Sequence, residues 1–177
     1  MRIRKKTRLN SQAGISMIEL MMAGTIMVIG SLGMIGLIVG SIATNNRNKL
    51  DSTQTMLAAS VLEQINSTII GVGSSNLIDC GGTNWDIDTA PGGASLSAST
   101  IDFAQSSPPA GYYMNYVLKN PCTSTGTTQG TYDVRWHVDV MGTTNTYMLT
   151  VAAELKNHGE GNLFFSKPVT LRVMSGN

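Results

Sequence analysis

One glutamate stands out because of the residues around it. Ile15 to Ile42 is a run of 28 residues in which Glu19 is the one ionisable side chain. An ionised carboxylate is costly in apolar surroundings unless it is paired, and such residues usually have a function. If the chain is cut just before the run, the new α-amino group of Ile15 becomes a partner, because residues four apart share one face of a helix. The alternative is a side chain that reaches polar surroundings at a membrane interface.

Small residues directly precede this apolar run. Ala13 and Gly14 follow a segment with five basic residues: Arg2, Arg4, Lys5, Lys6 and Arg8. In an ordinary secretory signal the small-residue cleavage site comes after the apolar stretch. Here the order is reversed, so a cut after Gly14 removes the charges and leaves the whole apolar segment on the mature chain. A retained membrane or filament anchor requires this order.

Cys80 and Cys122 lie outside the apolar run. In an oxidising compartment such as the periplasm they are natural disulfide partners, with two unpaired buried thiols as the alternative. The two cysteines are 42 positions apart in sequence. A disulfide that closes a loop of that length stabilises the fold by about 4 kcal/mol in the chain-entropy treatment.

Other chemistry-bearing residues form no complete site. We expect His137 and His158 to be surface histidines, because neither has a cysteine or carboxylate at ligand spacing. Asn84, Asp86 and Asp88 alternate as at the start of a calcium loop, but the glycine and the final glutamate of that loop are missing. No nucleophile elbow, phosphate-binding loop or Cys-x-x-Cys motif occurs. We therefore predict no enzymatic activity, no metal and no cofactor.

The apolar run is long enough to form a membrane helix. At about 1.5 Å per residue it exceeds the roughly 20 residues that cross a bilayer. The chain after Thr44 is polar enough to be soluble, and the basic leader predicts a cytoplasmic N-terminus with the C-terminal head across the membrane. Without the leader, seven basic and 11 acidic residues remain, a net charge of −4. This charge argues against nucleic-acid binding as the main task of the head.

The run from Gly14 to Leu20, Gly-Ile-Ser-Met-Ile-Glu-Leu, resembles the prepilin motif of type IV pilins and type II secretion pseudopilins. In that family a glycine ends the leader, and a glutamate is the fifth residue of the mature chain. The resemblance implies cleavage after Gly14 by the membrane-embedded prepilin peptidase and N-methylation of Ile15. It also implies that Glu19 pairs with the terminal amine of a neighbouring subunit and sets the axial register. Most members begin the mature chain with phenylalanine, whereas this one begins with isoleucine.

The resemblance covers roughly the first third of the chain. It divides residues 1–73 into a leader (1–14), a transmembrane or filament-core helix (15–44) and an amphipathic continuation (45–73). Gly36 and Gly40 form a small-xxx-small pair that suits close helix packing, although helix glycines also occur without that role. In the continuation, apolar residues recur at spacings of four or seven: Leu50, Leu57, Val61, Ile65 and Ile69. Gly71 to Gly73 is the predicted stop.

The remaining residues, 74–177, predict an antiparallel sheet head. Residues 74–111 read as a variable loop region with two short strands, Asn76–Ile78 and Ser99–Phe103. Tyr132–Val140 alternates apolar and polar residues, which predicts a half-buried strand. Further strands are predicted at 113–118, 147–155 and 163–173, the last at an edge or bulge because of Pro168. Short connections favour a meander. The predicted fold is therefore α+β and pilin-like, with a long N-terminal helix packed on an antiparallel sheet.

These features lead us to expect a minor type IV pilin, a subunit of the pilus or of its tip complex that acts in assembly, adhesion or motility. Chain length and the strand 132–140 are distantly similar to PilV-like minor pilins. The same anchor fits a type II secretion pseudopilin, and a third alternative is a membrane-tethered adhesin or sensor head that never polymerises. The expected partners are other pilins or pseudopilins, the prepilin peptidase and the inner-membrane assembly platform. The expected location is the bacterial inner membrane with a periplasmic head, then the pilus at the cell surface.

Overall fold

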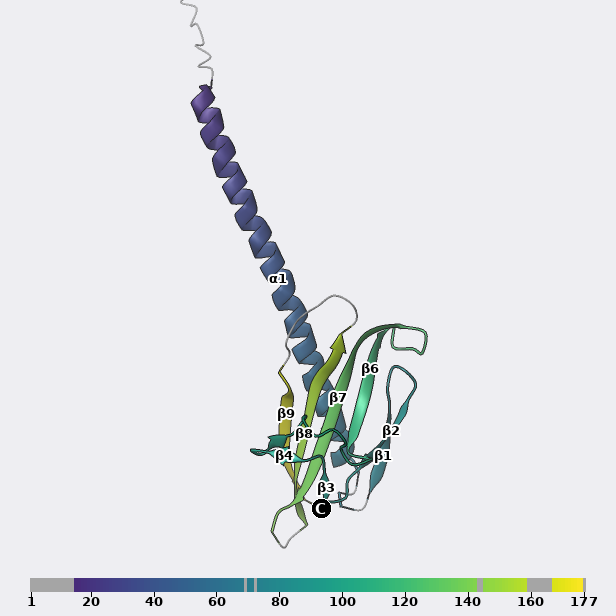
Figure 1. Ribbon diagram of the computed structural model, residues 1–177. Helices are drawn as coiled ribbons and strands as arrows, with labels where there is room; N and C mark the ends of the chain where they lie inside the picture. Colours follow the sequence, from purple (N-terminus) through teal and green to yellow (C-terminus); the bar gives the residue numbers. More distant parts are fainter. Residues whose placement is uncertain (1–14, 69, 72, 143–144, 159–166, 177) are drawn as a thin grey trace, which may run out of the picture. The chain divides into compact units, whose positions relative to one another are not determined.

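A computed structural model describes residues 15–68, 70–71, 73–142, 145–158 and 167–176. Two compact units divide the chain, Met1–Thr44 and Asn45–Asn177. Within the described ranges one helix precedes a series of strands (Figure 1): α1 (Met17–Asn66), β1 (Ser74–Ile78), β2 (Asn84–Asp88), β3 (Gly92–Gly93), β4 (Leu96–Ser97), β5 (Thr100–Ile101), β6 (Tyr113–Asn120), β7 (Thr127–Val140), β8 (Thr146–His158) and β9 (Val169–Gly176).

The first unit contains the apolar part of α1. Its large apolar side chains are exposed along the whole segment, from Ile15 to Ile42. Mean hydropathy reaches 2.3, and in the described part of the chain α1 is the one helix long and apolar enough to cross a membrane. The prediction of a membrane-length helix is confirmed.

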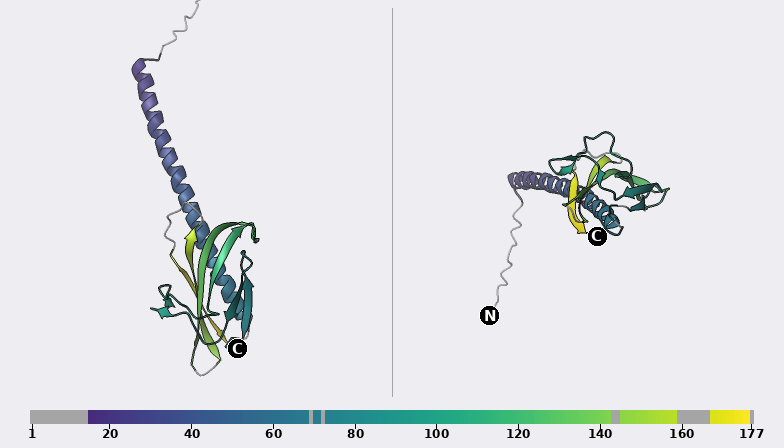
Figure 2. Two further views of the ribbon diagram at one scale, coloured as in Figure 1. Left: turned by 45° about the vertical axis from the view of Figure 1, so that its right-hand side comes forward. Right: turned by 90° about the horizontal axis from the view of Figure 1, so that it is seen from below.

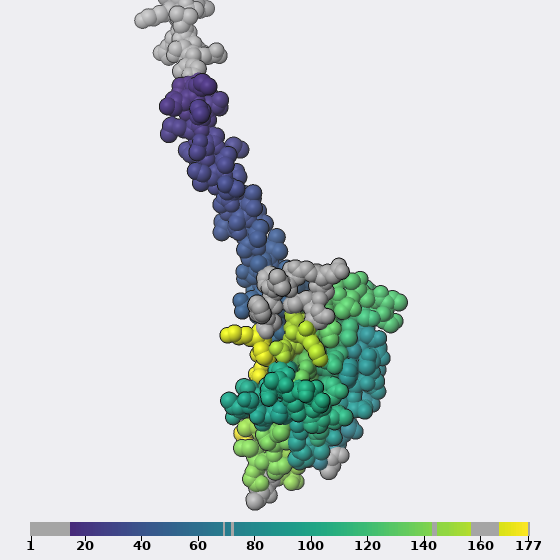
Figure 3. Space-filling view, viewed as in Figure 1, coloured from purple at the N-terminus to yellow at the C-terminus, as the bar shows by residue number. Residues whose placement is uncertain are grey.

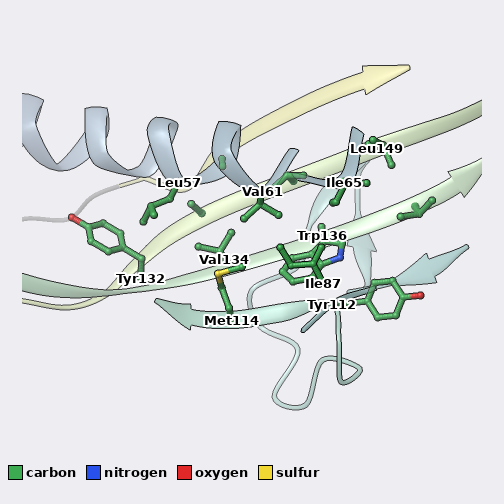
Figure 4. Close-up of a cluster of buried hydrophobic side chains, with 14 of the residues drawn as sticks. Leu57, Val61, Ile65, Ile87, Tyr112, Met114, Tyr132, Val134, Trp136 and Leu149 are labelled. Atoms are coloured by element: carbon green, nitrogen blue, oxygen red, sulfur yellow. The ribbon is translucent and has the colours of Figure 1, made fainter. Parts of the chain in front are cut away.

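The second unit begins with the polar part of α1, which packs on one face of the sheet. Leu57, Ala58, Val61 and Ile65 are buried, as the spacing of four predicted. Figure 4 shows Leu57, Val61 and Ile65 on the helix side of this core. Facing them are Tyr132, Val134 and Trp136, which alternate along β7 and point to the same face. This two-layer core confirms the α+β class.

The main sheet is antiparallel, in the order β3-β7-β8-β9, with β6 also paired to β7. The strands β6 to β9 follow one another in sequence and in space, so the predicted meander is confirmed. In its register Trp136 lies opposite Val151, and Val151 lies opposite Leu171. As expected from Pro168, β9 is an edge strand and begins immediately after that proline. A separate hairpin joins β1 to β2, and a short one joins β4 to β5.

The helix ends at Asn66, before the predicted glycine stop. Its last turn continues through Ser67, whose N–H donates to the carbonyl oxygen of Glu63. Gly71 has a different purpose: its φ is +98°, and a Cβ there would lie 2.6 Å from the hydroxyl of Tyr147. The positive φ favours glycine, and the tyrosine hydroxyl would have to move to admit a Cβ. The glycine belongs to the packing of the connection on β8 and does not end the helix.

The prediction of a half-buried β7 was wrong. We name residues 92–107 the strap: it begins as β3, which pairs with β7, and its later residues cover the face of the sheet opposite the helix (Figures 2 and 3). The strap brings Ala94 and Ile101 into a second small core with Ala152 of β8. It approaches β7 so closely that a Cβ on Gly93 would lie 2.5 Å from the carbonyl oxygen of Trp136. The region predicted as a variable loop thus contains ordered strands and closes the outer face.

Candidate functional site

The described residues begin next to the predicted cleavage site. Gly14 lies outside them, whereas Ile15 is described, non-helical and 74% exposed. Ser16 caps α1: its Oγ accepts a hydrogen bond from the N–H of Glu19 at 3.2 Å, and its carbonyl oxygen accepts one from Leu20 at 3.2 Å. The helix therefore starts two residues after the predicted new terminus.

Glu19 occupies the first turn of the helix and is exposed. With Ser16 it forms the Ser-x-x-Glu pattern of a capping box, in which an acidic side chain is favoured by the positive end of the helix dipole. This local role was missed by our sequence reasoning, although the pattern can be read directly from the sequence. Glu19 thus has two candidate roles, one within its own helix and one in pairing with a terminal amine.

From Leu20 to Ile42 the surface of the helix is exposed. A Cβ built on Gly36 or Gly40 would meet no atom within 4 Å. The small-xxx-small pair is therefore open to a second helix, and its packing role stays a prediction. Ile18, Met21, Met22 and Ile26 border the same exposed, apolar stretch.

Cys80 and Cys122 form a disulfide, with their Cα atoms 4.7 Å apart. The bridge joins the β1–β2 turn to the β6–β7 turn, two hairpin ends that are 42 residues apart in sequence. Beside it, the buried carboxylate of Asp79 accepts hydrogen bonds from the N–H of Thr83 at 2.8 Å and the indole N–H of Trp85 at 3.2 Å. It also accepts a longer one, 3.4 Å, from the N–H of Val117 on the edge strand β6. The disulfide and the Val117 contact attach the hairpin to the sheet, and the other two hydrogen bonds lie within the hairpin.

A buried ion pair lies under the strap. The guanidinium of Arg135 donates from Nε to Oδ1 of Asp133 at 3.1 Å and from Nη2 to Oδ2 at 2.8 Å. Its Nη1 donates to the backbone carbonyls of Asp102 and Gln105 at 3.1 and 2.9 Å. The ring of Phe103 covers the same group at 5.2 Å. Arg135 therefore connects the strap to the sheet through charge-assisted bonds.

The histidine prediction needs correction at His137. Its side chain is 19% exposed, with Nδ1 2.7 Å from the carbonyl oxygen of Ala94 and Nε2 3.0 Å from Oδ1 of Asp139. It is a partly buried contact between β7 and the strap. The side chain of His158 lies outside the described residues. Asn84, Asp86 and Asp88 share one face of β2, and no group of three metal-ligating side chains is found among the residues that the structure describes.

One carboxyl group on the outer face of the sheet, that of Glu154, has a raised pKa. Burial raises the pKa of Glu154, the nearby Asp133 carboxylate raises it further, and Arg135 opposes the change. Glu154 lies opposite Asp133 in the register of β7 and β8. Of these groups, Arg135 contacts the strap directly.

No protein-family model, curated protein or solved structure matches the chain. Its architecture, a long N-terminal apolar helix followed by an antiparallel sheet, is compatible with that of pilins.

Proposed function

We propose that this chain is a minor type IV pilin, a structural subunit of a pilus or of its tip complex. One observation carries the proposal: a basic leader, small residues at 13 and 14, and an apolar helix with a glutamate in its first turn follow one another in that order. Cleavage after Gly14 discards the charges that orient the chain and leaves the helix for assembly. The exposed apolar surface from Ile15 to Ile42 supports this, because a filament core would bury it.

In this proposal Glu19 pairs with the terminal amine at Ile15 of a neighbouring subunit once both enter the filament. The pair sets register because an unpaired charge in an apolar core is strongly unfavourable. Removing one partner of a buried pair costs about 3 kcal/mol or more. This free energy corresponds to a decrease of roughly a hundredfold in the equilibrium constant for assembly.

The test must separate this pairing from helix capping. Glu19→Gln removes the charge but keeps a residue that completes a capping box. Ser16→Ala removes the cap, a loss of about 1 kcal/mol, and keeps the charge. We expect both variants to be cut after Gly14, as measured by mass spectrometry of the N-terminus. Sheared filaments should contain far less Glu19→Gln protein and a normal amount of Ser16→Ala protein. Equal loss in both variants would refute the registration role of Glu19.

Further measurements distinguish the alternative functions. An N-terminus that remains Met1, or a cut beyond residue 42, would exclude every pilin-like function and leave a tethered adhesin or sensor. A deletion strain that loses twitching but keeps protein secretion supports a pilus subunit. Loss of secretion with normal twitching would instead identify a type II secretion pseudopilin, which uses the same anchor.

A further inference from the structure

Two exposed cations follow the apolar part of α1. Arg47 and Lys49 are the first charged residues after Glu19, and both side chains are exposed. They lie two positions apart on one helix, so they project about 200° apart around its axis. Exposed Asn45 and Asn48 flank them. Residues 45–49 therefore form a polar, positively charged collar around the helix, whereas the helix from Leu20 to Thr44 carries no charged side chain.

Among the described residues, no ion pair involves Arg47 or Lys49. The ion pair in the described ranges joins Asp133 to Arg135, and the one other acid–base contact there is that of Asp139 with His137. The carbonyl oxygen of Lys49 accepts the hydroxyl of Thr53, an ordinary contact within the helix. A protein partner would contact one side of the helix, whereas charges on opposite sides suit an anionic environment that surrounds it.

The spacing of polar groups along the helix agrees with such an environment. From Glu19 to Thr44 the rise is about 38 Å at roughly 1.5 Å per residue. A bilayer has a hydrocarbon core of about 30 Å, or about 40–45 Å with its headgroup layers. When Glu19 lies at one headgroup layer, the apolar segment therefore ends near the other. Long Arg and Lys side chains just beyond that end reach lipid phosphates.

We propose that Arg47 and Lys49 bind the phosphate groups of anionic lipids in the leaflet next to the head, and thereby set the depth of α1 in the membrane. The inference rests on the membrane-anchor part of the proposed function and is independent of filament assembly. It assigns Glu19 to the opposite headgroup layer before assembly, so its carboxylate leaves water only when the subunit enters a filament.

The test uses the full chain reconstituted in vesicles of phosphatidylcholine with a small amount of spin-labelled phosphatidylglycerol. Electron paramagnetic resonance then measures how strongly the anionic lipid is enriched at the protein, relative to spin-labelled phosphatidylcholine. The five leader cations are replaced by glutamine in every sample, because they would attract anionic lipid themselves. Arg47→Gln/Lys49→Gln is compared with the matched control Lys156→Gln/Lys167→Gln, which removes two exposed charges from the head.

We expect enrichment of phosphatidylglycerol in the parent chain, about fivefold per cation at low salt. The collar variant should lose it, the control should keep it, and added salt should weaken it. Equal association of the two lipids with the parent chain would overturn the proposal, as would a collar variant that retains the preference. If the control variant loses the preference for phosphatidylglycerol as fully as the collar variant does, the preference comes from the net charge of the head, and the proposal is overturned. Filament incorporation does not enter this assay, so either proposal can fail alone.

Discussion

Replacing Arg135 by methionine tests how the strap is attached to the sheet. The change removes four hydrogen bonds, two to Asp133 and two to the carbonyls of Asp102 and Gln105. Because Asp133 is only 5% exposed, its carboxylate would remain buried without its cation. Breaking a buried pair from one side costs about 3–5 kcal/mol, so we expect a loss of that size in the free energy of unfolding.

The assay is urea unfolding of the full chain in mild detergent, followed by tryptophan fluorescence. Trp136 is fully buried beside Arg135 and reports on this part of the sheet. The double variant Asp133→Leu/Arg135→Met removes both charges, and replacing a whole pair by apolar residues is often close to neutral. It should recover part of the loss. The part of the loss that the double variant does not recover is the cost of leaving the two strap carbonyls without a donor, since an unsatisfied buried acceptor costs about 1–3 kcal/mol.

A loss below about 1 kcal/mol for Arg135→Met would refute the reasoning. That is the value of a solvent-exposed ion pair, and it would mean that the strap does not exclude water from Arg135. The exposed change Lys156→Met serves as the reference, with an expected effect within about 0.5 kcal/mol.

Two further predictions concern the head. Cys80→Ser/Cys122→Ser should lower the free energy of unfolding by up to about 4 kcal/mol in the same assay, because the bridge closes a 42-residue separation; an unchanged urea midpoint would contradict this. For Glu154, a pKa raised above 4.5 means that the folded state binds the proton more tightly, so stability falls as pH rises from about 4.5 through the folded-state pKa. Glu154→Gln should therefore raise the thermal midpoint at pH 7 and leave it almost unchanged at pH 4, and a lower midpoint at pH 7 would contradict the sign.

Much of the fold could be predicted from periodicity. Alternation from Tyr132 to Val140 and from Tyr147 to Leu155 identified β7 and β8, because one buried face requires a period of two. Spacings of four identified the buried residues of α1 in the same way. These patterns are local: each arises because one face of one helix or strand is buried, which fixes the spacing of its apolar residues.

The strap could not be predicted because its signals are not local. Asp133 and Arg135 alternate with apolar residues as solvent-facing side chains do, and their burial depends on backbone groups about 30 positions earlier in the chain. Nothing in the local sequence identifies β7 as the partner of Gly92 and Gly93. The sequence predicted that Gly71 ends the helix. In the structure the helix ends earlier, and Gly71 instead packs against Tyr147.

At the N-terminal site the sequence contained more than we inferred. Ser16 and Glu19 have the spacing of a capping box, which supplies a local reason for a glutamate at this position. Neither role excludes the other. The cap acts in the isolated helix, whereas pairing with an amine requires cleavage at Gly14.

The strap also changes which surfaces of the head are available to partners. A half-buried sheet would have presented the polar residues of β7 to solvent, and the expected binding face would have been that one. Instead Asp133 and Arg135 are buried, and the exposed residues of the strap include its turn at Ala98 and Ser99. Both residues have a positive φ, 47° and 67°, which is uncommon for side chains other than glycine, asparagine and aspartate. At the side of the sheet, β9 presents Arg172 and Met174 along an edge that no described strand covers. Asp133 and Arg135 are therefore not available to a filament neighbour or a ligand, because the strap of the protein itself already covers them.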